Sequence, residues 1–225
     1  MKALKALFLA CSVVAVLGVG NAGAAAVSWS AATDNGLADV FGVKLAPGDL
    51  LLLGAFNIPD ATIQANSGNV AFLMSHFTTF GTSSIGTNVG GAPGFFFQNT
   101  TGNTATTTPF PVQGQRIYIW AFNTPLATTA TQEGIFSQTV AANWIFPTQG
   151  GNPDTTGVDI TDLTNAPSTA LAPGADIVIG GFQQGVGNTL DFNLALIPEP
   201  STYVLALVGG IALWLLRRRA VGVRR

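Results

Sequence analysis

The sequence predicts an all-β exported domain, an antiparallel β-sandwich or jelly roll, between an N-terminal signal helix and one C-terminal transmembrane helix. Two observations predict the β class. The apolar runs of residues 25–196 are short and are bounded by turn residues. This region is also rich in Gly, Thr, Asn, Ala and Phe, and it holds few helix-forming stretches. Its length suffices for one domain with its own core.

The first expected element is a signal peptide over residues 1–24. A basic start precedes the apolar residues 6–19, and Ala22 and Ala24 supply the small side chains that a signal peptidase reads. We expect cleavage after Ala24, with a cut after Ala26 as the alternative. The one cysteine of the chain lies in this segment, so the mature protein folds without a disulfide.

Five strands are expected within the exported domain. The run 116–122 is apolar on both faces, which is typical of a central strand. The last run alternates, so Asp191 and Asn193 should face one way and their apolar neighbours the other. The five expected strands are residues 50–56, 70–77, 116–122, 176–182 and 190–196.

Residues 83–114 differ in character from the rest of the domain. Thr, Asn and Gly crowd together there, which predicts a mobile loop or a hairpin tip with little apolar surface to bury. Asn99 begins an Asn-Thr-Thr sequence that fits the simple glycosylation sequon. Asn99 is therefore a candidate glycosylation site, and a plain solvated loop is the alternative that we favour.

The distribution of charge excludes one class of partner. All eleven acidic residues lie between Asp34 and Glu199, where Lys44 and Arg116 are the only basic residues, so the exported region has a net charge near −9. Such a surface repels the phosphates of nucleic acids. We expect no nucleic-acid partner.

The sequence predicts neither a catalytic site nor a cofactor. His76 is the only histidine, and it follows Ser75 on an expected strand, where successive side chains point to opposite faces. No zinc, phosphate-loop or nucleophile-elbow motif occurs. Asp154, Asp159 and Asp162 form a weak Ca²⁺ candidate, because carboxylates are hard oxygen ligands. Their spacing matches no EF-hand, and a solvated acidic loop is the favoured interpretation.

The chain continues from residue 197 into a distinctive tail. Residues 202–216 carry no charge and, as a helix, would span about 22 Å, which is short of the ~30 Å hydrocarbon core. The basic cluster that follows should stay on the cytoplasmic side. A tripeptide precedes the apolar segment, and its residues are Pro198, Glu199 and Pro200. The basic cluster consists of Arg217, Arg218 and Arg219.

This order of tripeptide, apolar helix and arginines resembles the PEP-CTERM sorting signal, which here covers residues 197–225. The resemblance implies that an exosortase in the inner membrane recognises Pro198, Glu199 and Pro200 and cuts near them. It also implies a Gram-negative host that makes exopolysaccharide. The protein would be an inner-membrane-anchored precursor and then a non-catalytic component of the cell surface, extracellular matrix or biofilm. Residues 115–123, followed by residues 133–136 and Trp144, are similar to a segment of many such proteins, which implies only a shared β-rich surface domain.

Two other functions remain open. A carbohydrate-binding or adhesive module would use exposed aromatic rings, with Trp120 and Trp144 as candidates, although both are expected in the core because their neighbours are apolar. A glycoside hydrolase using carboxylates alone would need two acids facing each other across a groove.

Overall fold

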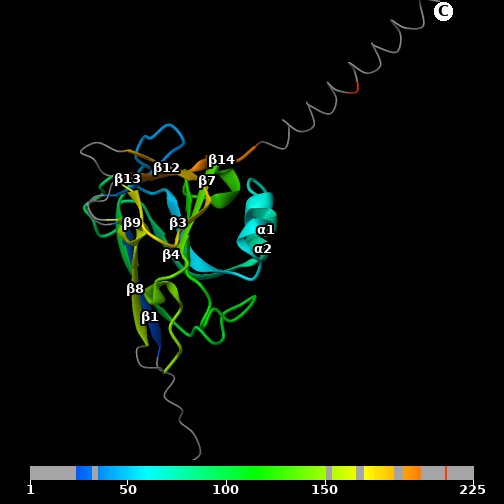
Figure 1. The fold of residues 1–225 in the computed structure, drawn as a ribbon, viewed down its shortest axis with the longest axis vertical. Coiled ribbons are helices and arrows are strands. Elements are labelled where there is room, and N and C mark those ends of the chain that lie inside the picture. Colours follow the sequence, from blue (N-terminus) through cyan, green and yellow to red (C-terminus); the bar gives the residue numbers. More distant parts are fainter. Residues whose placement is uncertain are drawn as a thin grey trace, which may run out of the picture.

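The computed structural model describes residues 24–31, 35–150, 154–165, 170–184, 190–198 and 211 (Figure 1). Within these residues the chain is mostly β, and most strand pairs are antiparallel, which confirms the expected class. No helix among the described residues is long and apolar enough to cross a membrane. Apart from Ile211, the expected spanning segment 202–216 lies outside them, as do residues 1–23 of the expected signal peptide.

The largest sheet has six strands. Its order is β11-β7-β6-β3-β4, with every neighbouring pair antiparallel, and β14 pairs with β7 beyond the end of β11. Its strands are β3 (Leu50–Phe56), β4 (Phe77–Ser84), β6 (Tyr118–Phe122), β7 (Gln132–Gln138), β11 (Ala175–Ile179) and β14 (Ala195–Leu196).

Three smaller sheets complete the part of the fold that the structure describes. β1 (Ala25–Ala31) lies between β5 (Phe96–Gly102), to which it is antiparallel, and β8 (Thr155–Asp159), to which it is parallel. A second sheet has the order β12-β13-β2, and β9 pairs with β10. Their bounds are β2 Leu37–Ala38, β9 Thr164–Asn165, β10 Ala170–Leu171, β12 Gly181–Gln184 and β13 Leu190–Asn193.

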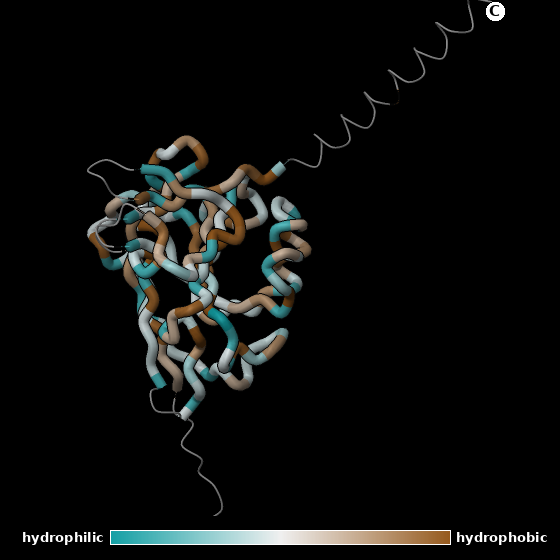
Figure 2. Tube along the Cα trace, viewed as in Figure 1, coloured by the Kyte–Doolittle hydropathy of each residue, from teal (hydrophilic) through white to brown (hydrophobic). Residues whose placement is uncertain are grey.

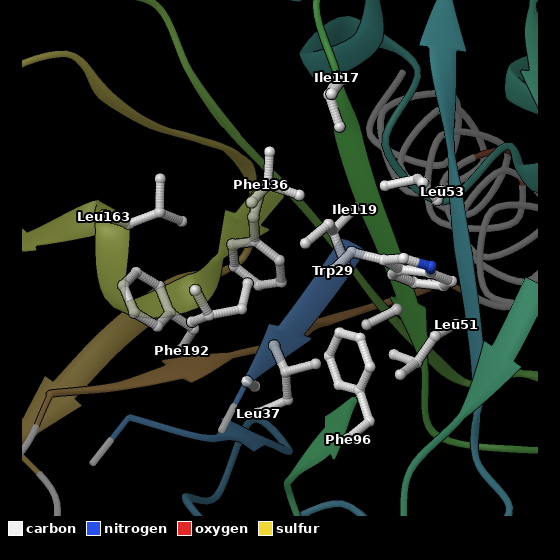
Figure 3. Close-up of a cluster of buried hydrophobic side chains, with 14 of the residues drawn as sticks. Trp29, Leu37, Leu51, Leu53, Phe96, Ile117, Ile119, Phe136, Leu163 and Phe192 are labelled. Carbon is white, nitrogen blue, oxygen red and sulfur yellow. The ribbon is translucent and has the colours of Figure 1, made fainter. Parts of the chain in front are cut away.

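The two faces of the large sheet carry two separate cores. Leu51 and Leu53 of β3 pack with Trp29 of β1 in the larger core, where side chains from several strands converge (Figure 3). Leu52 points to the other face, where it packs with Ile63 of helix α1 (Asp60–Ala65) and Leu73 of helix α2 (Val70–Ser75). One face is therefore covered by β1 and its neighbours and the other by two short helices, because both faces of the central strands are apolar.

Two predicted strands are confirmed. The prediction of residues 50–56 matches β3 at both ends. The run 116–122 contains β6, in which every residue is buried, as expected for a central strand. Arg116 itself lies outside β6 and forms an isolated bridge with Ile145.

The predicted strand 70–77 is wrong, because Val70–Ser75 forms helix α2 and β4 begins only at Phe77. The side chain of Asn69 caps the helix by accepting the N–H of Phe72, and Leu73 turns inward. His76 ends the helix, so the expectation that it lies on a strand beside Ser75 is also wrong.

The two C-terminal predictions each cover two strands. Residues 176–182 divide at Gly180 between β11 and β12. Gly180 has φ +115°, and a Cβ there would lie 2.4 Å from the carbonyl oxygen of Asn193, so this position requires glycine. Residues 190–196 divide at Leu194 between β13 and β14. Their alternation does not separate core from solvent, because Asp191 and Asn193 are buried whereas Leu196 is 59% exposed.

The loop expected over residues 83–114 is partly wrong. Its centre forms β5, which pairs along the whole of β1 from Ala31↔Phe96 to Ala25↔Gly102. Ser83 and Ser84 at its start end strand β4, and the other residues form turns and irregular chain, as expected. The backbone N–H and C=O groups of β5 that face β1 are hydrogen-bonded to that strand. Polar Thr and Asn side chains are then compatible with an edge strand whose outer face meets water.

Candidate functional site

The candidate site is the base of the tail, where the described chain leaves the large sheet. Leu196 of β14 pairs with Gln132 of β7, and the N–H of Ile197 donates to the carbonyl oxygen of Thr131 at 2.8 Å. Pro198 then packs on Gly68, in the turn between α1 and α2, so closely that a Cβ on Gly68 would lie 2.4 Å from the Pro198 Cδ. The first proline of the tripeptide is therefore seated on the folded body.

An apolar pocket of about 600 Å³ opens beside this contact. It lies between α2, the 3₁₀ helix η1 (Ala127–Thr129) and the tail base. The side chains that define it are Val70, Met74, Ala127, Ala130, Ile197 and Pro198. Its apolar lining and lack of a charged side chain suit an apolar group rather than a polar substrate.

A buried carboxylate ties this region to the core. Glu133 of β7 is fully buried, and its Oε1 accepts the Gly68 N–H at 2.7 Å while Oε2 accepts the Trp120 Nε1–H at 3.0 Å. Burial raises the pKa of Glu133, and these two hydrogen bonds only partly offset it. Because both oxygens are occupied and enclosed, Glu133 holds the α1–α2 turn in place rather than meeting a ligand.

A second polar cluster lies at the other end of the sheet. Arg116 donates to the carboxylates of Asp60, the first residue of α1, and of Asp176 in β11. The Tyr118 hydroxyl donates to Asp60 Oδ1 at 2.7 Å and accepts from Arg116 Nε at 2.9 Å. Four side chains from three elements and one loop are thereby joined.

The pKa values of the two carboxyl groups in this cluster are shifted in opposite directions. Burial raises the pKa of Asp60, but hydrogen bonds from Tyr118 and Arg116 outweigh it, so the pKa is lowered. Burial and the neighbouring Asp60 raise the pKa of Asp176. Two neighbouring carboxyl groups whose pKa values are pushed apart can act as a catalytic acid and base. Here, however, the pair is bridged by a guanidinium, and it anchors α1 against the sheet.

The three residues of the calcium candidate do not form a metal site. Asp159 and Asp162 form a capping box on the 3₁₀ helix η3 (Ile160–Leu163), and Asp162 Oδ2 also accepts the indole N–H of Trp144 at 3.0 Å. Among the described residues, no group of three or more His, Cys, Asp or Glu side chains could hold a metal ion. Asp154 lies just before β8 and is only half-buried.

Asn99 lies on β5 rather than in a loop, and its side chain is exposed. Its Oδ1 accepts a hydrogen bond from Ser28 of β1. The sequon therefore occupies an edge strand, where the Asn side chain is already engaged with its neighbour.

Trp29, Trp120 and Trp144 are each fully buried, which confirms the expectation that Trp120 and Trp144 belong to the core. They offer no exposed ring for a sugar. His76 is half-buried, and its Nδ1 lies 2.9 Å from Asn57 Oδ1.

The remaining predicted residues fall at or beyond the limits of the described chain. Ala24 is exposed and directly precedes β1, so a cut after Ala24 would leave that strand whole, whereas a cut after Ala26 would remove two of its residues. The predicted site residues that lie outside the described ranges are Ala22, Glu199, Pro200, Arg217, Arg218 and Arg219.

Sequence reasoning missed the roles of Gly68, Glu133 and Arg116. A signal for Arg116 exists, since a rare cation in a strongly acidic region should attract acidic partners. Nothing near Gly68 or Glu133 in the sequence indicates that they meet. Comparisons of the chain with protein-family models, with curated proteins and with solved structures found no match.

Proposed function

We propose that this chain is the precursor of an exported, non-catalytic surface or matrix protein, which an exosortase sorts and processes through the tripeptide at Pro198. The observation that carries the proposal is the order of Pro198-Glu199-Pro200, an uncharged apolar segment and three arginines. A basic cluster after an apolar segment stops transfer and retains the segment in the membrane. The resemblance to the PEP-CTERM signal assigns the cut to the tripeptide.

The geometry at the tail base supports this function. Pairing of the last strand ends at Leu196, and Pro198 packs at the surface against Gly68. Proline on both sides of Glu199 disfavours helix and keeps the peptide extended, which suits binding in a protease-like site.

For the exported body we propose a structural role in an exopolysaccharide matrix. The layers formed by β5-β1-β8 and by the large sheet share one core, which is the basis for proposing a sandwich. A sugar-binding role for the tryptophans is disfavoured because their rings are buried. A hydrolase role for Asp60 and Asp176 is disfavoured because Arg116 bridges them.

The test is processing in a native host. Glu199→Ala should abolish removal of the tail, and the unprocessed protein should stay in the inner-membrane fraction. Ser201→Ala, two residues away and outside the tripeptide, is the matched control and should be processed normally. Intact-mass analysis of the C-terminus of each product would locate the cut. Equal processing of wild type and Glu199→Ala would refute a motif-dependent exosortase step.

A further inference from the structure

Exposed apolar side chains gather at the end of the molecule from which the tail departs. β12, β14 and the loop of residues 39–45 lie together at this end (Figure 1), and hydrophobic stretches of the loop and of β14 are evident there (Figure 2). We call these side chains the exit face. They are Phe41, Val43, Leu126, Phe182 and Leu196, each more than half exposed.

Contacts around Gln132, the first residue of β7, bring the exit face together. The Val40 N–H donates to Gln132 Oε1 at 2.8 Å, which holds the loop before Phe41 against β7. Leu196 pairs with Gln132 across the strands, and Val40, Phe182 and Leu196 line one shallow pocket.

Leu126 belongs to the connection from β6 to β7, in which Asn123 Oδ1 accepts the N–H groups of Thr131 and Gln132, both at 3.0 Å. The same connection contains η1, which lines the 600 Å³ pocket. Ile197 also lines that pocket, and it follows Leu196 of the exit face directly, so the pocket and the exit face are neighbours. Patches of exposed apolar side chains on one side of a soluble domain mark an interaction surface.

The length of the linking chain identifies the partner. Only residues 199–202 separate Pro198 from Tyr203, the first large apolar side chain of the uncharged segment 202–216. Four residues extend at most about 14 Å. The polar interface of one leaflet is itself about 5 to 7 Å thick. If the apolar segment is embedded in the bilayer, the exit face cannot stand far from the lipid headgroups.

We propose that the exit face rests on the outer surface of the inner membrane while the tail is still attached, with Phe41 and Phe182 inserted among the lipid headgroups. This inference depends on the proposed function, because it needs the tail to be a membrane anchor. It goes further in assigning the body an orientation: the β7 end that carries Leu196 faces the lipid, and processing frees this face.

Charges near the exit face are compatible with lipid contact. Lys44 pairs with the buried carboxylate of Asp191, and the Asp39 carboxylate accepts the N–H groups of Phe41 and Val43 at 2.9 and 2.8 Å. These acids are thus satisfied from within the body. The body as a whole remains acidic, so zwitterionic headgroups should be preferred over anionic ones.

The experiment uses the full-length chain carrying Cys11→Ser, which removes its only cysteine, so that each introduced cysteine is unique. An environment-sensitive fluorophore is attached at Phe41→Cys or Phe182→Cys after reconstitution into phosphatidylcholine vesicles. Val140→Cys is the matched control, because Val140 is 71% exposed, Phe41 is 79% exposed, and Val140 lies just past the opposite end of β7. Lipids with a nitroxide near the headgroup report contact by quenching.

The expected result is a blue-shifted emission and strong quenching at positions 41 and 182, with a water-like emission and no quenching at position 140. Equal, water-like signals at all three positions would overturn the inference. So would a blue shift at position 41 that persists in detergent and grows with protein concentration, since it would indicate contact with a second copy of the chain.

A fourth label, at Val208→Cys, separates failure of this inference from failure of the proposed function. Quenching of that label by a nitroxide deep in the acyl region reports insertion of the tail. A quenched tail label with water-like labels at positions 41 and 182 would leave the proposed function standing and reject only the membrane contact. An unquenched tail label would reject the anchor itself, and the orientation with it.

Discussion

The two ends of β7 differ in the charged side chains that surround them. At one end, Gln132 pairs with Leu196 beside exposed apolar side chains, and the charged groups nearby are buried or paired. At the other end, Ser137 pairs with both Tyr118 and Asp176, and Arg116 links two half-buried carboxylates. The ends are about 20 Å apart along a strand of seven residues.

The difference agrees with the proposed orientation, in which the end that carries Arg116 remains in water. An ion pair at the edge of a sheet is tolerated where water solvates the unused lone pairs, whereas an apolar rim exposed to water costs free energy. The described body holds only two basic residues, and both are used in ion pairs, Lys44 close to the exit face and Arg116 at the far end. The exit face is thus left without an unpaired cation.

The largest expected effect is at the far end. Arg116→Met would leave Asp60 and Asp176 close together without their shared cation, and we expect a loss of about 3 kcal/mol in the free energy of unfolding. Urea denaturation of the purified protein near neutral pH measures it. Arg116→Lys keeps the charge but loses the planar fork, so its loss should be intermediate.

The cost of Arg116→Met should shrink in acid. The lowered pKa of Asp60 means that its contribution is complete above the ordinary value of 3.8 and is lost as pH falls through the folded-state pKa. A cost below 1 kcal/mol at neutral pH, or one independent of pH, would show that the cluster does not anchor α1.

The next effect is at the tail base. Gly68 has φ +84°, and Gly68→Ala adds a Cβ that collides with Pro198, so we expect a loss of about 2 kcal/mol and release of the tail base. Limited proteolysis should then cut more rapidly near residue 198. Gly114→Ala is the matched control, because Gly114 has φ +71° but no atom within 4 Å of the added Cβ. Equal losses and equal proteolysis would mean that Pro198 is not seated on Gly68.

A smaller effect concerns Glu133 and pH. Its raised pKa makes the folded state bind the proton more tightly than the unfolded state, so stability falls as pH rises from 4.5 through the folded-state pKa. Glu133→Gln cannot titrate. The stability of wild type minus that of the variant should therefore decline over this window, by at most about 1.4 kcal/mol per pH unit. A difference that stays flat with pH would contradict a raised pKa.

The smallest effect is expected from exposed apolar residues at the two ends. Phe41→Ser and Val140→Ser should each change the free energy of unfolding by less than about 0.5 kcal/mol, because both side chains are mostly exposed. Thermal unfolding of both variants measures this. A large loss from Phe41→Ser alone would mean that Phe41 stabilises the fold instead of forming an interaction surface.

The sequence predicted what depends on local pattern. Residues 50–56 form a continuous apolar run after a Pro-Gly turn, and β3 has those bounds. The run beginning at Val70 looked similar, but it becomes a helix because Asn69 caps it and one side chain per turn reaches the core. Six residues are too few for a helical period to be distinguished from a strand.

Other features depend on partners far along the chain. β5 forms because β1, which lies about seventy residues earlier in the sequence, offers a complete row of backbone partners. Asp191 is buried because Lys44 reaches it, and Gly68 meets Glu133 and Pro198 only in the folded state. Reading of the tail from sequence alone found Pro198 but not the surface on which it rests.

If the chain is exported as proposed, the position of β1 affects when the body can fold. This first strand of the body lies in the middle of its sheet, between residues 96–102 and residues 155–159. A chain that crosses a membrane from its N-terminal side could not close that sheet until residues 155–159 had crossed, and such long-range pairing is slow. On the proposed function, this topology would delay closure of the sheet while the chain is exported.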